Sequence, residues 1–321
     1  MIRMTNDETM SKRVRRFRIV LAVLVIIASS TVASVKGGRP TQLSGYQAVR
    51  VHYSPLNKMI ISVRINGQRA NLLVDTGSNQ VILDAGAAES FGVRSSQRDL
   101  RYIQFTRING QLLPVGFAQS LIAGGMNFGS TLVTLRESTH SDAGDTRVDG
   151  VLGLDLLNRH KAVINCRTKL IFFKVDQTRQ VDLSSVASAE KFTKIPLRRE
   201  ENGALTVPCS IHGRPARLLV DTGAFITIFH EAFLKSVGVP VEATRVSAHF
   251  ARGAWRKVSA GQINDLKIGG FKTPPAKFGV TALPNFTLLR SSARISGILG
   301  MDTLYNYHAI IDLDGMNLFL K

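Results

Sequence analysis

The sequence predicts an all-β fold of two related lobes, each with one or two short helices. Three observations predict it: a long block in the first half recurs in the second, short apolar runs alternate with glycine-containing turns, and the chain can bury a large core. Its 321 residues are 44% hydrophobic, which is typical of globular proteins. Each copy of the block has the size of a single domain.

The repeat spans most of the chain at a nearly constant offset. Asp221 follows Asp75 by 146 residues, and each lies in the same motif, Leu-Leu-Val-Asp-Thr-Gly. The matched blocks pair residues 63–73 with 209–219, 84–93 with 230–239, 148–158 with 295–306, and 162–174 with 309–321. An offset held within one residue over separate blocks indicates an internal duplication. Two copies of one lobe predict a pseudo-twofold axis between them.

The matched blocks also set the expected boundaries. We predict a first lobe at residues 46–175, a polar linker at 176–191 and a second lobe at 192–321.

Short apolar runs predict the strands of the first lobe, at residues 59–65, 71–74 and 80–83. Asn66-Gly67 and its counterpart His212-Gly213 suit a tight hairpin turn. Each turn would lead the chain into the strand that ends at Asp-Thr-Gly.

Each lobe is expected to carry helices outside these strands. The first would be capped near Asp84 and ended by Gly92, and its counterpart would be ended by Gly238. A second short helix is expected to begin at Asp155 and at Asp302, because a carboxylate at an N-cap accepts backbone N–H bonds.

The N-terminus carries a targeting pattern. The basic stretch SKRVRRFR precedes the apolar run IVLAVLVIIA and a tail of small residues. This order is typical of a secretory signal, with cleavage after Ala33 or Ser34. The weakly apolar stretch 19–35 also reaches the lower length limit of a membrane-spanning helix. Residues 1–35 are therefore either a signal peptide or an N-terminal membrane anchor.

Both interpretations place the rest of the chain outside the cytoplasm, because positive charges that precede an apolar segment tend to stay inside. We expect an extracytoplasmic protein that is periplasmic, secreted or anchored in the inner membrane.

Charge and cysteine content exclude other classes. The net charge is +18, which favours acidic partners, but the cations are scattered and form no aromatic-studded basic stripe, so nucleic acid is not an expected partner. Cys166 and Cys209 are expected to be buried and unpaired. No Cys or His residues have metal-ligand spacing, so neither a metal nor another cofactor is expected.

The two Asp-Thr-Gly motifs place carboxylates at the ends of apolar strands, where an ionised group is costly unless it is paired. If the two turns meet about a pseudo-twofold axis, Asp75 and Asp221 become neighbours. Two carboxyl groups in one site tend to hold a single proton between them. Such a pair offers a base that activates water and an acid that protonates a peptide carbonyl.

The motifs resemble those of the aspartic peptidase superfamily, and each lobe resembles a retropepsin-like (acid protease) domain, which implies two β-barrel lobes. The resemblance rests on LLVDTGS at residues 72–78, LLVDTGA at 218–224, and the later VLGLD and ILGMD segments. It implies an aspartic-type endopeptidase that cleaves protein or peptide substrates. Because both motifs lie in one chain, it implies catalytic competence as a monomer.

The resemblance also assigns roles to single residues. Asp75 and Asp221 would form the catalytic dyad. The supporting residues would be Thr76 and Thr222, each bonded to the opposite loop, and Gly77 and Gly223, whose N–H groups bind the carboxylates.

The residue after each motif differs between the lobes. We expect the Ser78 hydroxyl to donate to the outer oxygen of Asp75 and to favour its ionised form, whereas Ala224 offers no equivalent.

Two hairpins are expected to close over the substrate as flaps, at residues 106–116 and 249–258. Their candidate tip and contact residues are Asn109, Gly110, Gly253 and Trp255. For Trp255, a structural role and packing on the substrate both stay open.

Two rival functions remain from the sequence. The first is a peptide-binding or scaffolding module that keeps the fold without turnover. The second is a glycosidase-type hydrolase, which also uses two carboxylates but has no need for symmetric Asp-Thr-Gly turns.

Overall fold

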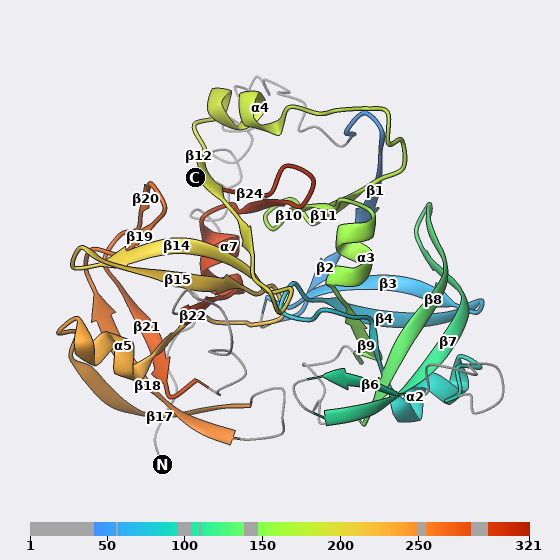
Figure 1. The fold of residues 1–321 in the computed structure, drawn as a ribbon, viewed down its shortest axis with the longest axis horizontal. Coiled ribbons are helices and arrows are strands. Elements are labelled where there is room, and N and C mark those ends of the chain that lie inside the picture. The colour runs from blue at the N-terminus through green and yellow to red at the C-terminus, as the bar shows by residue number, and fades with distance from the viewer. Residues whose placement is uncertain are drawn as a thin grey trace, which may run out of the picture. The chain divides into compact units, whose positions relative to one another are not determined.

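The computed structural model of the chain describes residues 42–55, 57–95, 105–108, 111–137, 147–249, 255–283 and 295–321 (Figure 1). Residues 42–321 form one compact unit. The predicted signal peptide or anchor at residues 1–35 lies outside the described residues. Among the helices that the structure describes, none has the length and apolar character needed to span a membrane.

The first lobe is built on a sheet with the strand order β2-β3-β4-β9-β5-β8-β7-β6 in the described residues. Its strands are β2 (His52–Tyr53), β3 (Met59–Ile65), β4 (Gln68–Val74), β5 (Ile82–Asp84), β6 (Phe105–Ile108), β7 (Gln111–Ala123), β8 (Met126–Arg136) and β9 (Gly150–Leu152).

The second lobe repeats this plan with the order β17-β18-β21-β16-β22-β15-β14-β19-β20, and β13 pairs with β14. Its strands are β13 (Arg198–Arg199), β14 (Leu205–Ile211), β15 (Arg214–Val220), β16 (Ile228–His230), β17 (Val241–His249), β18 (Trp255–Ile263), β19 (Lys267–Ile268), β20 (Phe271–Lys272), β21 (Ala276–Thr281) and β22 (Ile295–Leu299).

The same parallel pairings stand at the centre of both sheets. In the first lobe, β4 leads into Asp-Thr-Gly and pairs in parallel with β9. In the second lobe, β15 leads into the motif and pairs in parallel with β22. Both β9 and β22 come from the later repeated block. Leu73 pairs with Val151, and Leu219 pairs with Ile298. The duplication seen in the sequence is therefore a duplication of the sheet, and the predicted fold of two all-β acid protease lobes is confirmed.

A third sheet joins the two halves. Its order is β1-β11-β10-β23-β24-β12, from β1 (Tyr46–Arg50), β10 (Val163–Asn165), β11 (Leu170–Lys174), β12 (Thr193–Pro196), β23 (Ile310–Asp312) and β24 (Asn317–Leu320). At the junction, β10 and β23 run antiparallel, with Ile164 opposite Ile311. These two strands come from blocks that match each other in the repeat, so the duplicated segments pair across the pseudo-twofold axis.

An ion-pair cluster reinforces this shared sheet. The Nζ atom of the buried Lys174 lies 2.6 Å from Asp314, and that of Lys161 lies 2.9 Å from the same carboxylate. The Tyr46 hydroxyl also donates to Asp314, at 3.3 Å. The cations belong to the first half of the chain and the anion to the second, so the cluster ties the halves together.

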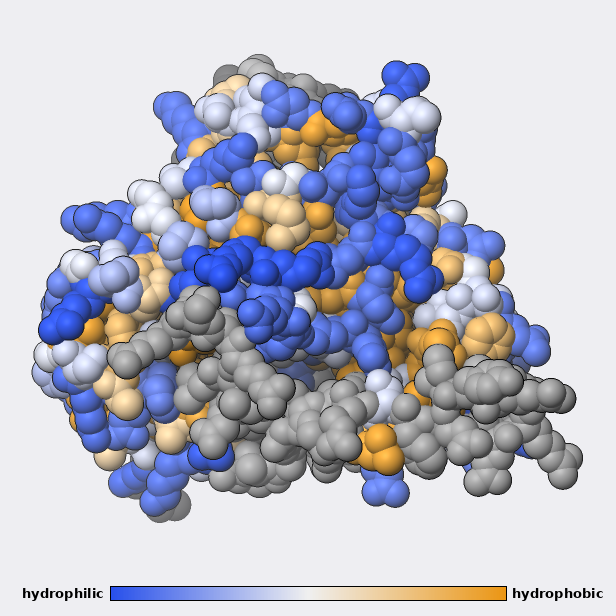
Figure 2. Space-filling view, viewed as in Figure 1, coloured by the Kyte–Doolittle hydropathy of each residue, from blue (hydrophilic) through white to orange (hydrophobic). Residues whose placement is uncertain are grey.

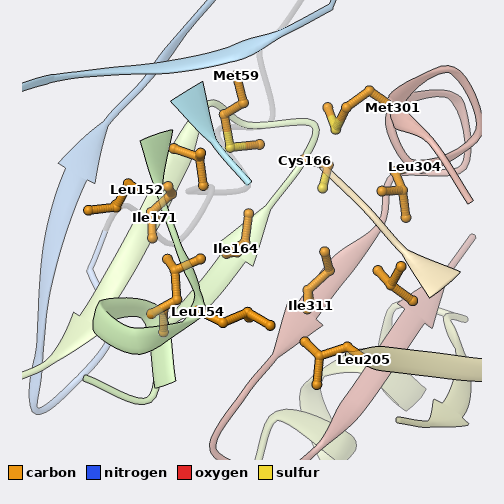
Figure 3. Close-up of a cluster of buried hydrophobic side chains, with 14 of the residues drawn as sticks. Met59, Leu152, Leu154, Ile164, Cys166, Ile171, Leu205, Met301, Leu304 and Ile311 are labelled. Atoms are coloured by element: carbon orange, nitrogen blue, oxygen red, sulfur yellow. The ribbon is translucent and has the colours of Figure 1, made fainter. Parts of the chain in front are cut away.

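One hydrophobic core also crosses between the halves. Figure 3 shows Met59, Leu152 and Ile164 from the first half near Met301, Leu304 and Ile311 from the second, with Cys166 among them. Cys166 and Cys209 are both buried and unpaired, as predicted. On the face that Figure 2 shows, the described residues are mostly hydrophilic, as expected for the surface of a globular protein.

The predicted hairpin turns are confirmed. Asn66 and Gly67 have φ of 49° and 84°, and His212 and Gly213 have φ of 50° and 72°. Two successive residues with positive φ form the turn that matches the twist of a two-residue β-hairpin.

The helices within the described ranges are α2 (Ala85–Ser90), α3 (Leu154–Arg159), α4 (Leu183–Ala189), α5 (Glu231–Ser236) and α7 (Met301–Asn306). The predicted cap of α2 is confirmed, because Asp84 accepts the Ala87 N–H at 2.9 Å. Gly92 and Gly238 follow α2 and α5 with positive φ, as expected of helix-ending glycines. Helix α4 lies within the predicted linker and was not predicted; Asp182 caps it by accepting from Ser184 and Ser185.

The predicted N-caps of the second helix in each lobe are wrong by two residues. Gly153 and Gly300 occupy the N-cap positions of α3 and α7, and Asp155 and Asp302 lie in the first turn. The reason is steric: a Cβ at Gly153 would lie 2.3 Å from the Gln80 carbonyl oxygen. Only glycine allows the helix to begin so close to the loop that follows Asp-Thr-Gly.

Candidate active site

The two Asp-Thr-Gly turns meet, and their threonines bond across the interface. The Thr76 N–H donates to Thr222 Oγ1 at 3.0 Å, and the Thr222 N–H donates to Thr76 Oγ1 at 3.1 Å. The two hydroxyls donate in turn to the Val220 and Val74 carbonyls, both at 2.8 Å. Both threonines are fully buried, so these four bonds fix the turns against each other without competition from water.

Each glycine of the motif lies against the aspartate of the other lobe. A Cβ added to Gly77 would lie 2.6 Å from Cγ of Asp221, and one added to Gly223 would lie 2.5 Å from Cγ of Asp75. Only glycine fits at so close an approach. The contact brings the two carboxyl groups together, and they share a side-chain hydrogen bond.

Backbone N–H groups orient the carboxylates. Gly77 donates to Asp75 Oδ1 at 2.7 Å, and Gly223 and Ala224 donate to Asp221 Oδ1 at 2.8 and 3.0 Å. Both aspartates are half-buried, so the pair is held rigidly but stays open to a substrate. The structure thus brings together Asp75, Asp221 and their predicted supporting residues.

The shared environment raises the pKa of both carboxyls. Burial raises the pKa of Asp75, although the hydrogen bond from Asp221, the Gly77 N–H and the charge of Arg136 act against it. Burial raises the pKa of Asp221 well above its ordinary value, and the charge and hydrogen bond of Asp75 raise it further. The two residues titrate as one pair, and these directions favour a single proton shared between them.

The expectation for Ser78 is wrong. Its hydroxyl donates to the Gln80 carbonyl at 3.1 Å, and a hydroxyl has one proton to donate. The serine therefore closes the loop after the motif, and it leaves the outer oxygen of Asp75 to other donors.

A second pair of carboxylates, Asp155 and Asp302, supports the site. The sequence predicted them as helix N-caps. Asp155 accepts the Val81 N–H at 3.1 Å, and Asp302 accepts the Thr227 N–H at 2.8 Å. Each ties the first turn of a helix to the loop that follows Asp-Thr-Gly in its own lobe. The signal was in the sequence, because the Gly-apolar-Asp segment repeats with the motif, but only the fold shows which backbone groups the carboxylates meet.

Apolar side chains flank the aspartates on the face of each sheet turned away from the core. In the first lobe these are Leu73, Ile82 and Val151; in the second they are Ile228, Leu283 and Ile298. Successive residues of a strand point to opposite faces, so Leu73 lies on the same face as Asp75. We call this the active-site face of each lobe.

A cavity of about 460 Å³ lies elsewhere, lined by residues of β3 and β4 such as Ser62, Arg64 and Asn71. Neither aspartate lines it, so it does not belong to this site.

Hairpins stand where the flaps were predicted. Strands β6 and β7 pair up to Ile108 and Gln111, and β17 and β18 pair up to His249 and Trp255. In Figure 1 both hairpins lie on the side of the view opposite the shared sheet. Asn109, Gly110 and Gly253 lie outside the described residues, and Trp255 is described only as the first residue of β18. Their contact with substrate stays a prediction.

No cluster of His, Cys, Asp or Glu side chains suited to a metal ion is found in the described residues. The two carboxyls and the backbone donors around them supply acid–base chemistry at the site.

Comparisons with known proteins agree with this geometry. The family described as "Aspartyl protease" matches residues 207–303, and the family described as "gag-polyprotein putative aspartyl protease" matches residues 61–159. Each match contains one Asp-Thr-Gly motif. The chain belongs to the aspartic peptidase superfamily, with one retropepsin-like domain in each half.

One individual protein is similar in sequence over part of the chain, and one solved structure is similar in fold. A stretch of 109 residues is 30% identical to DNA damage-inducible protein 1 of Yarrowia lipolytica; it covers 34% of this chain and 25% of that protein, so the match spans about a quarter of the relative's length. The crystal structure of an aspartic proteinase from Irpex lacteus is similar in fold, with 14% identity, a TM-score of 0.50, and coverage of 86% of this chain and 96% of that one.

Proposed function

We propose that the protein is an aspartic endopeptidase that hydrolyses peptide bonds with a water molecule activated between Asp75 and Asp221. The observation that carries the proposal is the contact of each motif glycine with the carboxyl group of the opposite lobe. It makes one half-buried site out of two carboxyls, and such a pair supplies an acid and a base at once.

The two carboxyls take opposite roles, and the positive charge of Arg136, which acts on Asp75, supports Asp75 as the ionised member. Asp75, the ionised member, takes a proton from water as the water oxygen attacks the peptide carbonyl carbon. Asp221 gives its proton to the carbonyl oxygen, which yields a neutral tetrahedral diol. Asp75 then returns its proton to the amide nitrogen while Asp221 takes one from a hydroxyl. The C–N bond breaks, and the pair again holds one proton.

Fixed geometry supports this chemistry. Proton transfer by a positioned acid or base is worth about 10²–10⁴-fold in rate. The four threonine hydrogen bonds hold the two Asp-Thr-Gly turns, and with them both carboxylates, in a fixed arrangement. The apolar side chains of the active-site face favour an extended peptide with apolar groups near the cleaved bond. Strand-like main-chain bonds would hold such a peptide.

Both aspartates come from one chain, so we propose that the monomer is catalytically competent. Because the basic-apolar pattern of residues 1–35 is an export pattern, we propose that it acts outside the cytoplasm, either free or anchored to the inner membrane.

The test is digestion of a peptide library by the full chain from pH 3 to 7, with products identified by mass spectrometry. We expect cleavage by the wild type, none by Asp75→Asn or Asp221→Asn, and wild-type cleavage by Asp176→Asn, which changes an exposed aspartate of the linker. Turnover that survives in either dyad variant would contradict the proposal. Peptide binding without turnover in the wild type would favour a scaffolding module instead.

A further inference from the structure

The active-site faces of the two lobes differ in chemistry although the backbones match. The apolar residues Leu73, Ile82 and Val151 of the first lobe correspond to Leu219, Ile228 and Ile298 of the second. Around them, the first lobe carries polar residues where the second carries apolar or small ones. The differing pairs include Asn79 and Phe225, Gln80 and Ile226, Thr134 and Gly279, and Arg136 and Thr281.

The last of these pairs places a cation in the first lobe alone. Arg136 ends β8 opposite Asp84, and Thr281 ends β21 opposite His230 at the matching position. Thr281 is buried, and its hydroxyl donates to the Lys257 carbonyl at 3.0 Å. The second lobe therefore offers a neutral, satisfied group where the first offers a guanidinium.

Strand alternation fixes the face on which Arg136 lies. Val133 and Leu135 of β8 belong to the main core, so Thr134 and Arg136 lie on the other face. That face is the active-site face, because Thr134 pairs in register with Ile82 and its hydroxyl donates to Gln80 Oε1 at 2.8 Å. Gln80 belongs to the loop that follows the first Asp-Thr-Gly.

The acidic neighbours of Arg136 on this face are bound to other groups. Asp84 caps α2 through the Ala87 N–H. Asp149 pairs with Arg147 at 2.8 Å and accepts the Asn71 N–H at 2.9 Å. No ion pair of Arg136 is found within the part of the chain that the structure describes. Arg136 is half-buried. Its positive charge acts on Asp75 and opposes the rise of the Asp75 pKa that burial causes.

We propose that Arg136 is a specificity-determining residue that selects a substrate with an acidic side chain on the first-lobe side of the cleaved bond. The inference rests on the proposed peptidase function. An arginine fork binds a carboxylate through two parallel N–H bonds, and this one lies on the active-site face without a carboxylate partner of its own in the described residues. On the second-lobe side, the neutral Thr281 and the apolar Phe225 and Ile226 favour uncharged side chains.

The test uses matched peptides built on a sequence that the full chain cleaves. Glu, Gln or Lys is placed in turn at each position within four residues of the cleaved bond, and kcat/KM is measured at about pH 5.5, where a substrate glutamate is ionised. The enzymes are the wild type, Arg136→Gln, Arg136→Lys, Arg136→Glu and Arg69→Gln. The last removes an equal charge from an exposed residue at the far end of β4 from Asp75. Far-UV circular dichroism and thermal unfolding verify that each variant folds.

At one or more positions on the first-lobe side, the wild type and Arg69→Gln should cleave the Glu peptide about fivefold faster than the Gln peptide, the scale expected for a partly exposed ion pair. Arg136→Gln should reduce this ratio to about one, Arg136→Lys should retain part of it, and Arg136→Glu should favour Lys over Glu.

Equal cleavage of Glu and Gln peptides by the wild type at every position would overturn the inference while the peptidase function stands. A Glu preference that survives in Arg136→Gln would assign it to another residue. Absence of any cleaved peptide would overturn the peptidase function and the inference together.

Discussion

Replacing Thr76 with valine should loosen the contact between the lobes by an amount that the structure sets. The hydroxyl of Thr76 donates to the Val220 carbonyl and accepts the Thr222 N–H. Valine keeps the side-chain volume but leaves both of these backbone groups unpaired in a fully buried place. Each unsatisfied group costs about 1–3 kcal/mol, so Thr76→Val should lower the free energy of unfolding by about 2–6 kcal/mol.

The matched control is Thr76→Ser, which keeps the hydroxyl and loses one methyl group, at a cost of about 1 kcal/mol. Urea unfolding of the full chain, followed by circular dichroism, measures the three free energies. Thr222→Val should match Thr76→Val, because its hydroxyl makes the mirror-image bonds to Val74 and Thr76. If the valine variants cost no more than the serine variant, the cross-lobe bonds do not hold the turns together.

Four further outcomes follow from the site and the shared sheet. Gly77→Ala, whose Cβ would lie 2.6 Å from Cγ of Asp221, should lower kcat/KM more than about a hundredfold. The control Gly270→Ala, whose Cβ would make an ordinary contact of 3.5 Å with Thr193, should retain activity, and equal losses would refute the steric argument. Ser78→Ala should leave the acid limb of the pH–rate profile unchanged, because the Ser78 hydroxyl donates to the Gln80 carbonyl. A shifted acid limb would show that the Ser78 hydroxyl does act on Asp75. The alkaline limb should lie above the ordinary aspartate pKa of 3.8, because burial and the charge of Asp75 raise the pKa of Asp221; a limb at 3.8 would contradict a shared proton. Burial raises the pKa of Asp314, but hydrogen bonds and charges from Lys174 and Lys161 outweigh burial and hold this pKa below its ordinary value. The ionised carboxylate therefore stabilises the fold at a pH above its ordinary pKa, and this contribution is lost as the pH falls through the pKa of the folded state. Asp314→Asn should therefore lower the free energy of unfolding at pH 7 and not at pH 2, and an equal effect at both would argue against the ion pairs.

Local signals in the sequence predicted much of each lobe. Asn66-Gly67 set a hairpin because both residues tolerate positive φ, and Asp84 capped a helix with its own carboxylate. The duplicated motif predicted that Asp75 and Asp221 would meet, because a repeated lobe that packs on its copy brings equivalent turns to one axis.

Other features depend on contacts between distant segments, which a local pattern does not encode. The antiparallel pairing of β10 with β23 joins the halves through strands that look like ordinary apolar runs. Gly153 takes an N-cap position because the Gln80 carbonyl lies against it. The Ser78 hydroxyl turns to Gln80 rather than Asp75. The place of Arg136 on the active-site face follows from strand register, which the sequence alone did not set.

The shared proton is the central claim, and carbon-13 NMR of the full chain labelled at aspartate Cγ tests it most directly. Spectra of Asp75→Asn and Asp221→Asn assign the two resonances. We predict that the pair loses its protons in two well-separated steps and that each single variant abolishes this separation. If both carboxyls lose their protons together near the ordinary aspartate pKa of 3.8, they do not form one site.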